Sequence, residues 1–77
     1  MTTSQIITRE KWVQITDGNN TATIQFSGLI FICSSPTEPV PDAPALMISD
    51  TQQLLTVTPP DICWVRAADT DVVLTIL

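Results

Sequence analysis

The stretch TATIQFSGLIFIC, residues 21–33, decides the fold class of this chain. In its first half the apolar residues Ala22, Ile24 and Phe26 alternate with Thr and Gln, which is the period of a β-strand that buries one face. Gly28 then breaks the pattern, and residues 29–33 are apolar on both faces. We expect this second strand to be central in its sheet, or to be covered on its second side by something such as a partner.

Short alternating segments rich in β-branched residues continue along the chain and are separated by turn-forming residues. They predict strands at residues 11–16, 21–27, 29–33, 45–49, 52–58, 62–67 and 72–77, with residues 4–8 as a first strand or as part of an N-terminal arm at residues 1–9. Helix is nearly absent from this pattern. Seven or eight short antiparallel strands at such spacing predict an all-β fold, a compact β-sandwich or barrel that forms a single domain over residues 1–77.

The turn signals also suggest which strands pair. The sequence DGNN at residues 17–20 separates two of the segments, so we expect residues 11–16 and 21–27 to form a hairpin. Two further hairpins are expected, one turning around residues 50 and 51 and one around the ADTD turn at residues 68–71. The WVQ of the first half and the WVR of the second half echo each other, either because two hairpins are related or by chance.

Residues 34–44 are predicted to form a proline-rich loop. Four prolines fall within the nine residues PTEPVPDAP, and such a segment favours the stiff polyproline II conformation at the surface. Pro36 and Pro39 also have the P-x-x-P spacing that docks into aromatic grooves, although proline-rich loops more often serve as stiff connectors.

The charge balance excludes several classes of function. Eight acidic residues face three basic ones, for a net charge of -5, so the chain lacks the basic stripe that nucleic acid requires. The longest apolar run, residues 29–33, is too short for a membrane-spanning helix, and the first residues show no secretory signal, which predicts synthesis in the cytosol. Without histidine, two cysteines cannot complete a Cys/His zinc site, and we expect neither metal nor cofactor.

Catalysis is not expected either. Most of the acidic residues lie in predicted turns, where Asp bonds to local backbone, and Lys11 is the only lysine. Cys33 and Cys63 lie in apolar strand segments, where burial raises the pKa of a thiol and makes it a poor nucleophile. We expect two buried free thiols, although a disulfide between them is geometrically open.

The apolar residues favour a protein that works by contact with other chains. In a fold of 77 residues the free energy gained by burying apolar surface is nearly cancelled by the entropy lost on ordering the chain. Strands that are apolar on both faces also tend to aggregate unless another surface packs against them. Trp12 and Trp64 hold most of the aromatic area, and they are interpreted either as core residues or as anchors of a subunit interface. A third interpretation is a platform on which a sugar stacks, although few polar residues lie near either ring to bind the sugar hydroxyls. The predicted interface comprises Trp12, Leu29, Ile30, Phe31, Leu46, Met47, Ile48 and Trp64.

Three stretches, KWVQITDG at residues 11–18, PDAP at 41–44 and WVR at 64–66, resemble small virion proteins of tailed bacteriophages. The resemblance covers nearly the whole chain in layout and implies a capsid (head) decoration, head-fibre or tail accessory protein. It further implies symmetric homo-oligomers, often trimers, that bind the major capsid protein or another virion protein. Such a protein would be made in the bacterial cytoplasm and located in the virion, with no nucleic-acid or membrane partner.

Two other functions are compatible with the sequence. A receptor- or glycan-binding module of a tail or head fibre would use an exposed Trp12 or Trp64 for recognition, but a fibre needs a shaft that 77 residues do not supply. A cytosolic adaptor or inhibitor of host proteins fits the small acidic chain, and no specific residue supports it.

Overall fold

The computed structural model describes residues 2–49 and 54–77, and in these ranges the chain contains eight β-strands and no helix. The strands are β1 (Thr3–Ile7), β2 (Val13–Gln14), β3 (Ala22–Ser27), β4 (Leu29–Ser34), β5 (Leu46–Ser49), β6 (Leu55–Val57), β7 (Cys63–Ala67) and β8 (Val72–Ile76). The predicted all-β fold is therefore confirmed, and residues 4–8 belong largely to a paired strand instead of a loose arm.

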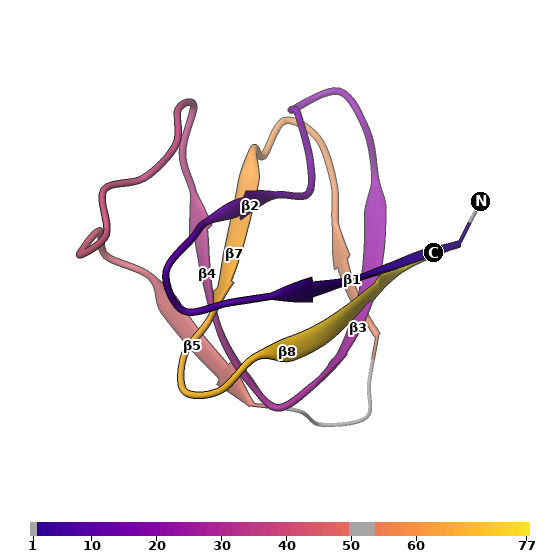
Figure 1. Cartoon of the computed structure of the whole chain (residues 1–77). Helices are drawn as coiled ribbons and strands as arrows, with labels where there is room; N and C mark the ends of the chain where they lie inside the picture. The colour runs from indigo at the N-terminus through magenta and orange to yellow at the C-terminus, as the bar shows by residue number, and fades with distance from the viewer. Residues whose placement is uncertain (1, 50–53) are drawn as a thin grey trace.

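The strands form two four-stranded antiparallel sheets, in the orders β1-β8-β3-β6 and β2-β7-β4-β5 (Figure 1). We call them the β1-edged sheet and the β5-edged sheet. Eight strands in two sheets with this order form a jelly roll, the double-sheet version of the Greek key. Strand β4 lies between β7 and β5, so its predicted central position is confirmed.

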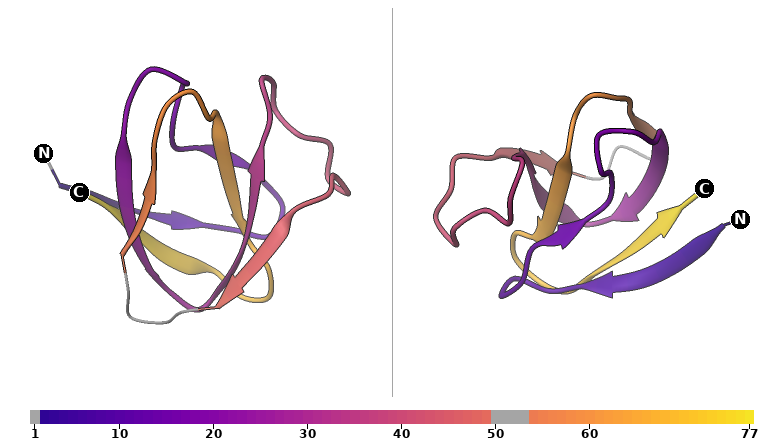
Figure 2. Two further views of the ribbon diagram at one scale, coloured as in Figure 1. Left: turned by 180° about the vertical axis from the view of Figure 1, so that it is seen from behind. Right: turned by 90° about the horizontal axis from the view of Figure 1, so that it is seen from above.

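One long hairpin explains the strand order. Strand β1 pairs with β8, β2 with β7, β3 with β6 and β4 with β5, so each strand of the first half pairs with its counterpart counted back from the end. The register is continuous to within one residue: Thr3 lies opposite Ile76, Val13 opposite Val65, Ala22 opposite Val57 and Leu29 opposite Ser49. The loop at residues 35–45 is the tip of this hairpin, and it lies on the opposite side of the molecule from the chain ends (Figure 2).

The long hairpin rolls up because both of its arms bend at matching places. Pairing of β3 with β8 and of β4 with β7 closes the roll. Gly28 makes the bend between β3 and β4, with a φ of 125° that only glycine adopts readily, and a Cβ at this position would lie 3.0 Å from Cγ2 of Val72. Each bend carries the chain from one sheet to the other.

The three hairpins predicted between neighbouring segments are wrong for this reason. Residues 11–16 and 21–27 contribute to β2 and β3, which lie in different sheets, and the same is true of β7 and β8. Strands β5 and β6 also belong to different sheets, while the turn predicted between them falls at residues 50 and 51, outside the described residues. Turn-forming residues reverse the chain equally well within a sheet and between two sheets, so these signals did not distinguish the two cases.

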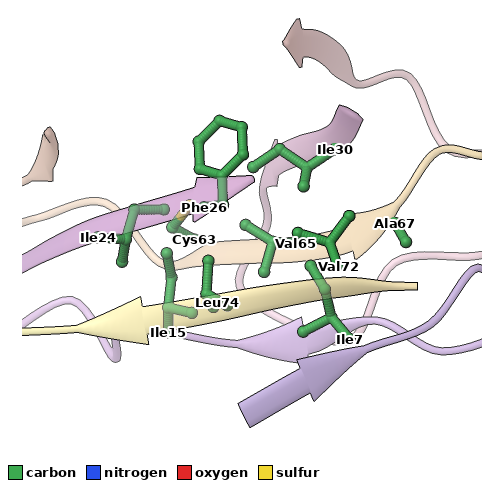
Figure 3. Close-up of a cluster of buried hydrophobic side chains, with 10 residues drawn as sticks. All are labelled: Ile7, Ile15, Ile24, Phe26, Ile30, Cys63, Val65, Ala67, Val72 and Leu74. Atoms are coloured by element: carbon green, nitrogen blue, oxygen red, sulfur yellow. The ribbon is translucent and has the colours of Figure 1, made fainter. Parts of the chain in front are cut away.

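The core fills the space between the two sheets with alternate residues of the strands. Burial alternates along β3 and β7, and the side chains inside are aliphatic apart from Phe26 and Cys63 (Figure 3). The largest fully buried apolar side chains are Ile7, Ile24, Ile30, Val65, Val72 and Leu74. Each such side chain stabilises the folded state by about 1.5–3 kcal/mol because its apolar surface is removed from water.

Thr16 is the buried polar residue that joins two bends of the long hairpin. Its Oγ1 donates a hydrogen bond of 2.8 Å to the carbonyl oxygen of Asp61 and accepts one of 2.8 Å from the backbone N–H of Cys63. The residue is 2% exposed, so no water replaces these bonds. Thr16 therefore continues the link between the two arms beyond the end of β2.

Candidate interaction surfaces

The outer face of the β5-edged sheet carries a row of large side chains with an arginine at its centre. Phe31 lies opposite Arg66, and Trp12 occupies the next position in the same row because Val13 lies opposite Val65. The guanidinium carbon of Arg66 is 5.0 Å from the ring centroid of Trp12 and 4.9 Å from that of Phe31. Both distances lie within the range of cation–π attraction.

Arg66 and Trp12 hold the proline-rich loop over this face. The two terminal nitrogens of Arg66 donate hydrogen bonds of 2.9 Å to the carbonyl oxygens of Arg9 and Pro41. Trp12 Nε1 donates to the carbonyl oxygen of Val40 at 3.2 Å, and Pro39 is buried in the same loop. The second face of β4 is thus covered in large part by the chain itself, where the sequence suggested cover by a partner.

Trp64 fastens the start of the same loop. Its ring is half-buried, and its Nε1 donates a hydrogen bond of 2.9 Å to the carbonyl oxygen of Ser35. Trp12 is 5% exposed, so its ring offers no platform on which a sugar could stack. Of the three interpretations of the tryptophans, packing within the chain therefore describes Trp12, and Trp64 packs in the same way with part of its ring open.

The structure divides the predicted interface residues into two groups. Ile30 and Trp12 are buried, so their assignment to the surface is corrected: Ile30 is one of the inward residues of β4 and has no exposed area. Leu29, Phe31, Ile48 and Trp64 are partly buried. Leu46 and Met47 on β5 remain as exposed apolar residues, 70% and 61% open.

An open cavity of about 530 Å³ lies beside Leu46, at the end of the sandwich nearest the proline-rich loop. Its lining is mostly apolar and includes Ile32, Pro44, Leu46, Val57, Asp61 and Cys63. Burial and, to a smaller extent, the neighbouring Asp61 and Cys33 together raise the pKa of the Cys63 thiol to about 11. The thiol is therefore protonated at neutral pH and is a poor nucleophile.

The two cysteines are both free thiols. Cys33 lies opposite Trp64 on β7, which places it on the other face of the sheet from Cys63, the next residue of that strand. Side chains on opposite faces of one sheet do not have the geometry of a disulfide. Within the described residues, no group of three or more His, Cys, Asp or Glu side chains could hold a metal ion.

The outer face of the β1-edged sheet is free of charge. None of the residues in β1, β8, β3 and β6 is charged, and Arg66 is the one charged residue in any of the eight strands. Hydroxyl pairs cross the strands on this face, between Ser4 and Thr75 at 3.3 Å and between Thr23 and Thr56 at 3.1 Å. Ile6, Val73, Leu54 and Leu77 lie among these polar groups and are more than half exposed.

This neutral face was not predicted as an interface. The signal for it was present in the sequence, because residues 2–8 and 72–77 contain no charged side chain, but the pairing of β1 with β8 was needed to bring the two segments together.

The four edge strands differ in how well they are protected against pairing with another chain. Strand β2 has two residues and begins two residues after Lys11. Strand β6 has three and ends two residues before Pro59, and β5 has four and begins two residues after Pro44. Strand β1 has five residues, with no proline and no charge among residues 2–8. Charges, prolines and shortness are the usual protections of an edge, so β1 is the least protected of the four.

No protein-family model, curated protein or solved structure matches this chain. None of the described residues lies in a helix that is long and apolar enough to cross a membrane.

Proposed function

We propose that this chain is a non-enzymatic structural subunit of a phage virion, a capsid decoration or accessory protein that associates with itself and with the capsid. The observation that carries the proposal is the uncharged outer face of the β1-edged sheet. The particle context comes from the resemblance to small virion proteins, and the jelly roll adds an analogy, since viral capsid proteins also use this fold.

The neutral face favours self-association because it removes the main obstacle to it. Copies of a chain with a net charge of -5 repel one another wherever their acidic loops meet. On the β1-edged sheet the strands bring no charge to the contact, and they offer exposed Ile6 and Val73 for burial and hydroxyl groups for hydrogen bonds. Met47 on the outer face of β5 and Leu46 at the cavity are two further exposed apolar residues, which are left for the larger partner.

The proposal is tested by adding one negative charge to each outer face in turn. Ile6 of β1 lies on the outer face of the β1-edged sheet and Gln14 of β2 on that of the other sheet, and both are exposed. Ile6→Glu should weaken self-association at least about tenfold in sedimentation velocity, because the like charges of two copies then repel each other at their contact. Gln14→Glu, the matched control, should leave self-association unchanged.

Attachment to a particle is measured by co-sedimentation of the purified protein with assembled phage capsids. We expect saturable binding with a fixed number of copies per capsid, and weaker binding for a Met47→Glu variant. A wild-type protein that stays monomeric at high concentration and does not sediment with capsids would refute the proposal. Binding to a glycan array without capsid binding would instead support the fibre module.

A further inference from the structure

We propose that β1 is the strand through which two copies join, by pairing antiparallel with β1 of a second copy about a two-fold axis at Gln5. This inference rests on the self-association proposed above and adds the surface, the register and the symmetry. It follows from which backbone groups of β1 point away from its own sheet.

The hydrogen-bond pattern of β8 determines the direction of those groups. The N–H of Leu77 donates to the carbonyl oxygen of Thr23 at 2.9 Å, so the backbone groups of Leu77 point toward β3. Directions alternate along an antiparallel strand, and those of Ile76, Leu74 and Val72 therefore point toward β1. Their partners Thr3, Gln5 and Ile7 complete the ladder inside the chain.

Ser4 and Ile6 are the residues of β1 that this ladder does not use. Their N–H and C=O groups point away from β8, toward the open edge of the sheet. Thr8 continues the alternation and confirms the direction, because its carbonyl oxygen accepts a hydrogen bond from Ala67 of β7 and not from β8. The open edge therefore offers two donors and two acceptors at alternate positions.

A second copy fits this edge in one simple register. With Gln5 opposite Gln5 of the other copy, Ser4 faces Ile6 and Ile6 faces Ser4, and each of these pairs exchanges two backbone hydrogen bonds. All of the outward groups of both β1 strands are satisfied. The two sheets become one continuous sheet of eight strands, with an outer face whose strands carry no charge.

A second copy is favoured as the occupant over a different protein for two reasons. The register is self-complementary, since the same two residues supply donors and acceptors on both sides. The contact also avoids the acidic loops, so the repulsion expected between two chains of charge -5 is smallest at this edge. The contact is small, so it forms at high local concentration, such as the surface of a particle provides.

The test combines two substitutions of Ser4 with measurements of mass and amide exchange. Ser4→Pro and Ser4→Ala both remove the exposed hydroxyl that bonds to Thr75, but only Ser4→Pro removes the outward N–H, which the chain itself does not use. We expect a dimer at about 1 mM protein that dissociates near 10 µM for the wild type and Ser4→Ala, and a monomer throughout for Ser4→Pro. In wild-type protein the amides of Ser4 and Ile6 should exchange slowly only at the high concentration, whereas those of Gln5 and Ile7 should be protected at both.

A second pair of variants keeps the test decisive if Ser4→Pro lowers the melting temperature. Ile6→Lys places a charge at the β1 edge, and Thr56→Lys places the same charge on the same face at the opposite edge, in β6. Only Ile6→Lys should abolish the dimer. A trimer, association that persists in both β1 variants, or concentration-dependent protection at Met47 and Ser49 would overturn the β1 pairing and leave the proposed self-association standing. A wild-type chain that is monomeric at every concentration would overturn both.

Discussion

Arg66 should be worth about 2 kcal/mol to the stability of this chain, and Arg66→Met tests that value. Methionine keeps an unbranched chain between the rings of Trp12 and Phe31 but removes the guanidinium. The substitution therefore separates the polar contacts of Arg66 from the space that its side chain fills.

The magnitude follows from the contacts of the guanidinium. The two hydrogen bonds to the carbonyl oxygens of Arg9 and Pro41 contribute about 1 kcal/mol each, and each cation–π contact adds about 0.5 kcal/mol at a half-exposed site. Against this, the Nε of Arg66 is buried without a hydrogen-bond partner, which costs about 1 kcal/mol. The remaining 2 kcal/mol, approximately, corresponds to a fall in melting temperature of about 12 °C for a chain of this size.

Urea unfolding followed by tryptophan fluorescence measures this loss, since Trp12 and Trp64 both bond to the loop at residues 35–45 and report its release. Arg66→Lys is the matched control. Lysine keeps the charge, but one ammonium group does not reproduce the fork that reaches two carbonyl oxygens, so an intermediate loss is expected. If the free energy of unfolding of Arg66→Met lies within about 0.5 kcal/mol of the wild-type value, the loop is held by packing alone and the reasoning fails.

Substitutions at three further residues test the bends and the core. Thr16→Val should destabilise the chain by about 2–3 kcal/mol, because it leaves the backbone groups of Asp61 and Cys63 without partners. Thr16→Ser keeps the hydroxyl and should destabilise the chain less. Thermal unfolding of the two variants makes the comparison. Gly28→Ala should cost about 2 kcal/mol in urea unfolding, since alanine disfavours a φ of 125° and its Cβ would crowd Val72, and a stability equal to the wild type would show that the bend is not strained. The pKa of Cys63 is raised from 9.0 to about 11 in the folded chain, so the folded state keeps this proton to a higher pH than the unfolded state does. The free energy of unfolding should therefore be insensitive to this group below pH 9 and fall as the pH rises toward 11. In Cys63→Ala this fall should be smaller.

The sequence predicts the strands of this fold better than their partners. Alternation in residues 21–27 correctly assigns Ala22, Ile24 and Phe26 to the core, because side-chain direction along a strand depends on position alone. Pairing depends on distant residues: β2 pairs with β7, more than forty residues further along the chain, and not with the neighbouring β3. The echo between Trp12-Val13-Gln14 and Trp64-Val65-Arg66 has a structural counterpart, since these two segments lie side by side with Val13 opposite Val65.

The surfaces were predicted only in part. Leu46 and Met47 are exposed as expected, but residues 29–33 are apolar on both faces and the sequence does not show which face turns inward. The structure places Ile30 inside and covers Phe31 with Arg66, an assignment that requires the register between β4 and β7. The neutral face on β1 and β8 likewise depends on a contact between the two ends of the sequence.

Because the first and last strands pair with each other, the chain ends could be joined and new ends opened elsewhere without changing the arrangement of the strands. Thr3 lies opposite Ile76, so a short peptide linker could join the two termini, and new ends could be opened in the loop at residues 35–45 without dividing a strand. Such a circular permutant would keep both sheets intact. It would also free the β1 edge of any affinity tag, which at either end of the present chain would stand beside the strand that we expect to meet a second copy.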